Sequence, residues 1–141
     1  MYDNIIVFNL RKNIHQIKEV FMKVIFINYP KCSTCQKAKK FLDDHNVQYE
    51  DRNIVTDTPT VEELKKWIEM SELPINKFFN TSGMLYRSMN LKESLKVTSD
   101  EEKIQMLASD GMLIKRPILV LKDNVLVGFK EESWLENISK K

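Results

Sequence analysis

The residues best suited to chemistry are two cysteines, Cys32 and Cys35, which stand three positions apart and are the only cysteines in the chain. A C-x-x-C pair between a strand and a helix is typical of thiol–disulfide chemistry, because one sulfur can attack a disulfide and the other can resolve the adduct. If the helix begins at about Ser33, Cys32 lies at its N-terminus, where free backbone N–H groups and the helix dipole favour a thiolate. We therefore predict Cys32 as the nucleophile and Cys35 as a more buried resolving thiol.

The same spacing also occurs in zinc sites and in pairs of inert buried cysteines. A structural zinc site needs two further ligands. The histidines His15 and His45 stand singly, without paired-ligand spacing, so we expect no metal. The order of strand, proline, C-x-x-C and helix favours redox chemistry over both alternatives.

Two arginines are candidates for holding an anion. Arg116 lies in Lys115-Arg116-Pro117, immediately before an apolar run that predicts a strand. In a thioredoxin-like sheet this junction lies beside the cysteine turn, where Arg116 could stabilise a thiolate or bind an oxyanion. A cis bond before Pro117 would expose backbone groups there to a disulfide-linked partner. The alternative is a surface arginine before an edge proline; Arg87 is the second candidate anion ligand.

The segments around the cysteines predict a β-α-β unit. Residues 23–28 form a compact apolar run, and the helical pattern that starts near Ser33 should end near residues 45–46. Residues 47–52 then alternate as a strand does. The short connections make the two strands parallel neighbours.

The rest of the chain predicts a helical insertion and then a hairpin. A helix opens at residues 58–60, and residues 73–108 are helical with short breaks. Residues 118–121 and 125–128 predict two strands joined by a tight turn, before a last helix over residues 131–138. The fold class is therefore α/β, with a mixed four-stranded sheet and a helical insertion between the second and third strands.

Length and composition place these elements in one domain. The 141 residues carry a net charge of +2 and 43% hydrophobic residues, which is typical of a globular chain. Residues 22–141 are the predicted domain, and residues 1–21 are a leader of unclear role, β-like over Tyr2–Leu10 and helix-like over Arg11–Phe21. Met22 is an alternative start.

Several classes of partner are not expected from this composition. Lysines alternate with acidic residues along the predicted helices, which is typical of a solvated face, so we expect no direct binding to nucleic acid. No apolar run approaches the ~20 residues that cross a bilayer, and no signal peptide is visible. We predict a cytoplasmic monomer that does not bind membranes.

Over about residues 22–139 the chain resembles the arsenate reductase (ArsC/Spx) family. The resemblance implies a thioredoxin-like fold with the helical insertion described above. It depends on several stretches taken together, which are more specific than C-x-x-C alone: residues 29–38, 50–54, 78–83, 86–87, 107–113 and 115–118.

The family's arsenate reductases use one cysteine to attack arsenate and three arginines to hold the oxyanion, and glutathione with glutaredoxin then releases arsenite. Cys32 matches the nucleophile, and Arg87 and Arg116 fall where two of the arginines are expected. Near the third position the chain offers only Lys130, a point charge without the bidentate fork of arginine. The resemblance implies a substrate site of Arg87, Arg116, Lys130 and Pro117. It also implies no bound cofactor, and glutathione/glutaredoxin or thioredoxin as electron donor.

The Spx branch of the family supplies the alternative function. Its members are redox-sensing transcription regulators that bind the RNA polymerase α-subunit and use C-x-x-C as a switch. Cys35 favours that branch, whereas residues 68–74 lack the glycine of its polymerase contact, and Tyr86-Arg87 resembles the reductases. We therefore predict a cytosolic thiol–disulfide oxidoreductase or arsenate-reductase-like enzyme acting on a thiol or oxyanion small molecule, with an Spx-like regulator as the alternative.

Overall fold

The sheet at the centre of the molecule has four strands. The computed structural model describes residues 23–139, so the predicted leader and Met22 lie outside the described residues. The strands β1 (Val24–Asn28), β2 (Tyr49–Asn53), β3 (Ile118–Val120) and β4 (Val125–Val127) are arranged in the order β2-β1-β3-β4. β1 and β2 are parallel, and the other two pairs are antiparallel. The mixed sheet predicted from the sequence is confirmed.

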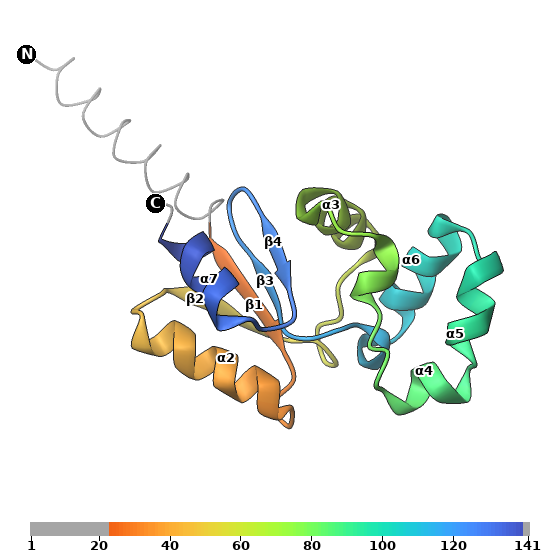
Figure 1. The fold of residues 1–141 in the computed structure, drawn as a ribbon, viewed down its shortest axis with the longest axis horizontal. Helices are drawn as coiled ribbons and strands as arrows, with labels where there is room; N and C mark the ends of the chain where they lie inside the picture. The colour runs from red at the N-terminus through yellow and green to blue at the C-terminus, as the bar shows by residue number, and fades with distance from the viewer. Residues whose placement is uncertain (1–22, 140–141) are drawn as a thin grey trace, which may run out of the picture.

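One face of the sheet is covered by α2 (Ser33–Asp44) and α7 (Glu131–Ile138), as Figure 1 shows. The side chains of a strand alternate between its two faces. Phe26 of β1 and its antiparallel partner Leu119 of β3 therefore point to the same face, where they pack in one cluster with Trp134 of α7. Ala38, Phe41 and Leu42 of α2 belong to the same cluster, which packs this helix against the sheet.

The opposite face is covered by α3 (Val61–Ser71). Thr60 caps this helix: its hydroxyl accepts from the Glu63 backbone N–H, and the Glu63 carboxylate accepts from the Thr60 N–H, which is a complete capping box. Trp67, only 4% exposed, packs in the same core cluster as Ile27 of β1. The two faces of the sheet thus have separate cores.

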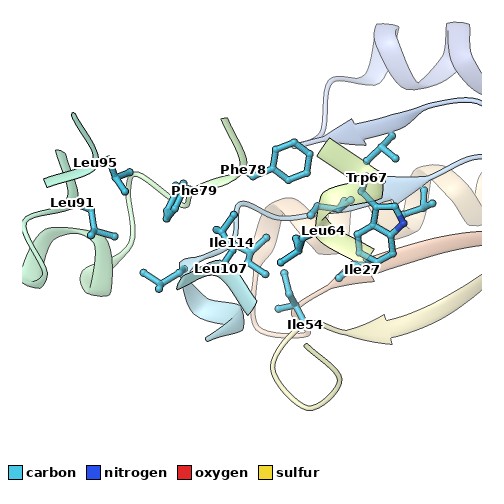
Figure 2. Packing of buried hydrophobic residues seen from close by; sticks show 14 residues of the cluster. Ile27, Ile54, Leu64, Trp67, Phe78, Phe79, Leu91, Leu95, Leu107 and Ile114 are labelled. Carbon is cyan, nitrogen blue, oxygen red and sulfur yellow. The ribbon is translucent and has the colours of Figure 1, made fainter. Parts of the chain in front are cut away.

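The segment between β2 and β3 is a series of short helices after α3, as predicted. Its apolar side chains extend the core outward from Ile27 and Trp67 to Leu91 and Leu95 (Figure 2). No helix in the described part of the chain is long and apolar enough to cross a membrane. The pieces are η1 (Ile75–Phe78), α4 (Met84–Ser88), α5 (Leu91–Ser94), η2 (Leu95–Val97), α6 (Asp100–Ser109) and η3 (Gly111–Leu113).

Backbone hydrogen bonds tie this insertion to the segment that leads into β3. The Lys115 N–H donates to the Phe78 carbonyl at 2.8 Å, and the Asn80 N–H donates to the Leu113 carbonyl at 2.8 Å. Gly111 permits a close approach nearby, because a Cβ there would lie 2.0 Å from the Ile54 carbonyl oxygen. The turn that follows Asn80 is thereby held beside the start of β3.

Candidate active site

Cys32 lies where β1 gives way to α2. It is the N-cap residue of α2, with extended backbone angles (φ −94°, ψ 119°). Its N–H donates to the Tyr29 carbonyl at 3.0 Å, and its own carbonyl accepts from the Gln36 N–H at 3.0 Å. The predicted position at the helix N-terminus is therefore confirmed.

The surroundings of Cys32 favour its thiolate. Partial burial raises its pKa, but hydrogen bonds from the backbone and thiol of Cys35 and the hydrogen bond and positive charge of Arg116 outweigh that effect. The net result is a pKa below the ordinary value of a thiol. A larger fraction of this sulfur is therefore nucleophilic at neutral pH than in a free cysteine.

Cys35 is the opposite case. It lies in the first turn of α2 and is only 2% exposed. Burial raises its pKa to about 12, and the adjacent Cys32 sulfur contributes to the same shift. Cys35 is thus a protonated thiol that touches the reactive sulfur and is closed to direct attack on a substrate.

Arg116 lies beside the cysteine turn and has no carboxylate partner in the described part of the chain. The peptide bond between Arg116 and Pro117 is cis. The Arg116 Cζ lies 5.1 Å from the centroid of the Tyr29 ring, so the guanidinium is in cation–π range of it. Its Nε and Nη1 are buried and find no hydrogen-bond partner among residues 23–139. Buried donors are nearly always paired, so this guanidinium has unused capacity to bind an anion.

A pocket of about 660 Å³ opens in front of Cys32. Three of its lining residues are cationic, namely Lys115, Arg116 and Lys130, and none is acidic. The rest form a polar turn and an apolar wall: Thr34, Asn80, Thr81, Ser82, Gly83, Met84, Leu85, Met112, Val127, Gly128 and Phe129.

The structure places most of the predicted site residues at one pocket and Arg87 at its rim. Arg116 and Lys130 line the same pocket as Cys32, and Pro117 is buried next to Arg116. Arg87 is exposed and is not among the lining residues. Its Nη2 donates to the Ser82 carbonyl at 3.1 Å, so in this structure Arg87 holds the turn at the pocket rim.

Sequence reasoning missed three parts of the pocket. Lys115 stands beside Arg116, but the sequence assigns it no role of its own, and residues 80–83 appear there as a break between helices and as part of the family resemblance, without a place at the site. Gly128 gave no signal beyond its type; it has φ +76°, which favours glycine, and the Lys115 side chain passes over it. The signal for Lys115 was its place in the same strand-entry tripeptide as Arg116.

His45 lies at the end of α2 away from the cysteine turn, and the described residues contain no group of side chains arranged as a metal site. His45 is the C-cap residue of α2, and its Nδ1 lies 2.8 Å from the Phe41 carbonyl oxygen. Among residues 23–139 no group of three or more histidine, cysteine, aspartate or glutamate side chains is arranged to hold a metal ion.

Comparison with known proteins gives a consistent family. The ArsC family model matches residues 27–137. The uncharacterized protein YusI of Bacillus subtilis (strain 168) is 51% identical over 116 residues, which are 82% of this chain and 98% of YusI. The crystal structure of an ArsC family related protein from Bacteroides fragilis has 54% identity and a TM-score of 0.79, covering 82% of this chain and 97% of that one.

More distant relatives have two kinds of name. The arsenate reductase from Vibrio cholerae is 28% identical with a TM-score of 0.73, covering 82% of this chain and 97% of that one. The global transcriptional regulator Spx 1 of Bacillus cereus is 28% identical over 110 residues, which are 77% of this chain and 82% of the regulator. The matched region contains the cysteine turn, the insertion and the strand entry that form the pocket, and the chain belongs to the ArsC family.

Proposed function

We propose that this protein is a cytosolic thiol–disulfide reductase of the arsenate-reductase-like kind, with Cys32 as nucleophile. One observation carries the proposal: the Cys32 sulfur, with its lowered pKa, lies beside an arginine that has unpaired donors, in a pocket with three cations and no acid. A low-pKa, accessible thiol in positive surroundings is typical of a reactive cysteine. A purely structural cysteine pair does not need such a pocket.

The reaction would proceed in two exchanges. The Cys32 thiolate attacks one sulfur of a substrate disulfide, the substrate S–S bond breaks, and the other half leaves as a thiolate. Cys35 then loses its proton to solvent and attacks the Cys32 sulfur, forming the Cys32–Cys35 disulfide and releasing the second substrate thiolate. An external dithiol of the thioredoxin or glutaredoxin class supplies the two electrons that restore both thiols.

The high pKa of Cys35 fits the order of these steps. The adjacent Cys32 sulfur is one of the groups that raise the pKa of Cys35. Once Cys32 is in a mixed disulfide, it no longer carries a thiolate charge, so ionisation of Cys35 becomes easier. The second thiol therefore becomes more reactive at the stage at which it is needed.

The test is a substrate panel with two cysteine variants. Wild type, Cys32→Ser and Cys35→Ser would be assayed with arsenate, a glutathione mixed disulfide and a protein disulfide, each with glutaredoxin or thioredoxin recycling. We expect wild type to turn over a member of the panel, Cys32→Ser to be inactive, and Cys35→Ser to accumulate a mixed disulfide detectable by mass spectrometry. No turnover in any arm, together with Cys32 titrating as an ordinary thiol, would refute the reductase.

A redox regulator is the second candidate, favoured by the likeness to Spx 1 and by the C-x-x-C pair. Formation of the Cys32–Cys35 disulfide would remove the thiolate beside Arg116 and so change the charge of this surface. A pull-down with the C-terminal domain of the RNA polymerase α-subunit, under reducing and oxidising conditions, separates the candidates. Retention in one redox state supports the regulator, and no retention in either state favours the enzyme.

A further inference from the structure

Lys115 is placed in the pocket by the absence of a side chain at Gly128. A Cβ on Gly128 would lie 3.1 Å from the Lys115 Cε and 3.9 Å from its Nζ. The lysine stem therefore lies against the bare Gly128 backbone at the end of β4. The Lys115 N–H donates to the Phe78 carbonyl at 2.8 Å. The backbone from which this side chain projects is therefore held by the insertion.

The charge of Lys115 is not neutralised within the described chain. Its side chain has no ion-pair or hydrogen-bond partner among residues 23–139, and the same is true of Lys130. Together with Arg116 they give the pocket three positive charges without a counterion from its own lining. Charges of one sign in a concave site concentrate a ligand of the opposite sign.

The dimensions of the pocket indicate an organic ligand. At about 660 Å³ it falls in the range of sites for small organic molecules, about 300–1,000 Å³. An inorganic oxyanion would fill a small part of it, since one water occupies about 30 Å³. The wall formed by Met84, Leu85, Met112, Val127 and Phe129 offers apolar surface that such an ion cannot use.

We propose that Lys115, seated over Gly128, is a specificity-determining residue that selects carboxylate-bearing organic disulfides for attack by Cys32. The inference rests on the proposed function, because it concerns the substrate of the same pocket. Arg116 contacts the Cys32 sulfur, so its unpaired donors can serve a charge close to the reacting atoms, whereas Lys115 can contact a charge elsewhere on the substrate. The apolar wall would cover the carbon skeleton between the sulfur and that charge.

The test uses two alkylating reagents of similar size and opposite suitability for a cationic pocket. Iodoacetate is an anion and iodoacetamide is neutral; in both reactions the Cys32 sulfur forms a bond to carbon, and iodide leaves with the electron pair of the C–I bond. The quantity measured is the second-order rate constant for iodoacetate divided by that for iodoacetamide. This ratio is normalised to the same ratio for the free thiol 2-mercaptoethanol. We expect a ratio above one for wild type, and a loss of about three- to tenfold in Lys115→Gln, the effect of one focused charge.

Three matched variants sharpen this measurement. Lys115→Arg keeps the charge and should keep the ratio. Lys31→Gln removes an exposed charge next to Cys32 in the chain but outside the pocket lining, and should change the ratio less than twofold. Gly128→Ala keeps the Lys115 charge but displaces its stem, and should lower the ratio by less than Lys115→Gln does. High salt should bring all the variants closer together.

A second pair of reagents tests the substrate class directly. Attack on 3,3′-dithiodipropionate, which bears two carboxylates, should slow in Lys115→Gln, whereas attack on neutral bis(2-hydroxyethyl) disulfide should not. An unchanged ratio in Lys115→Gln, or an equal loss in Lys31→Gln, would overturn the role of Lys115. The pH profile of the iodoacetamide rate tests the proposed function separately. A profile midpoint at the pKa of an ordinary thiol would refute the reductase. A lower midpoint together with an unchanged ratio in Lys115→Gln would refute only the role of Lys115.

Discussion

Two arginines lie near strand ends over aromatic rings, and their surroundings are opposite. The Arg52 Cζ is 5.7 Å from the Trp67 centroid, and the Arg116 Cζ is 5.1 Å from the Tyr29 centroid. Arg52 gives two hydrogen bonds to the Glu63 carboxylate, at 2.7 and 2.8 Å. Arg116 has two buried donors without a partner in the described chain.

The difference separates an arginine whose donors are paired within the fold from one whose donors are available to a ligand, as the proposed function requires of Arg116. Arg52 joins the end of β2 to the capping box of α3, because its partner Glu63 also accepts from the Thr60 N–H. The hydrogen-bond donors of Arg52 are therefore used within the fold. The Arg116 guanidinium lies over the Tyr29 ring and forms a hydrogen bond with the Cys32 sulfur. Its Nε and Nη1 donors remain available for a ligand.

The largest effect should come from breaking the satisfied member of the pair. Arg52→Ala leaves the Glu63 carboxylate without its cation, and we expect a loss of about 3 kcal/mol in the free energy of unfolding, the scale of a broken part-buried ion pair. Urea unfolding measures this loss. The alkylation rate of Cys32 in the folded variant should stay at the wild-type value. A lower rate would mean that the two regions are coupled.

Acid should weaken the same region. The Arg52 guanidinium is the main cause that lowers the pKa of Glu63 from 4.5 to about 2. The stability from this carboxylate is present above its unfolded pKa and is lost as the pH falls from about 4.5 to about 2. We expect about 2 kcal/mol after allowing for screening by solvent. Urea unfolding from pH 6 to pH 2 measures it, with Glu63→Gln as control; an equal acid loss in that variant would assign the effect to other groups.

Removing the unsatisfied member should affect reactivity instead. Arg116→Ala removes a hydrogen bond and a positive charge that lower the pKa of Cys32, so the pH profile of alkylation should move toward higher pH. We expect the rate at pH 7 to fall by about tenfold, the size of one strong charge interaction. Stability should change by less than about 1 kcal/mol, because the bond to the Cys32 sulfur is replaced by solvent at a partly exposed site and the Nε and Nη1 donors have no partner in the described chain to lose. An unchanged pH profile would contradict the assigned role.

The smallest effect should come from the ring beneath Arg116. Tyr29→Leu removes the aromatic face that holds the guanidinium, and the pH profile should move in the same direction by less, with a rate loss of about threefold at pH 7. Tyr29→Phe keeps the face and should behave as wild type. Loss of reactivity in the phenylalanine variant would assign the effect to the hydroxyl rather than to the ring.

Most of the fold could be predicted from local sequence patterns. The differences at the ends of the elements arise from contacts between residues that are distant in the chain. The β-α-β unit was predicted because its signals are close together: an apolar run, the C-x-x-C turn and an amphipathic helix. Its ends shifted slightly, since α2 ends at Asp44 and β2 begins at Tyr49 rather than at residue 47. Strand ends depend on pairing with β1, which no local pattern specifies.

The site shows the same division. The positions of Cys32 and Arg116 follow from their being next to the start of a helix and the start of a strand. The direction of the Arg87 side chain could not be predicted, because it depends on how the short helices of the insertion stack; its guanidinium donates to the Ser82 carbonyl at the pocket rim. Lys115 was overlooked because its place depends on Gly128, which lies on a different strand end.

The backbone bonds between Phe78 or Asn80 and the entry to β3 have a consequence for how such proteins diversify. The sheet and α2 contribute the reactive sulfur, while the insertion contributes much of the opposite wall, including Asn80 and Met84. Substitutions in the insertion can therefore alter what fits against the sulfur and leave its ionisation intact. A change in the insertion can in this way alter which molecules fit against the same nucleophile.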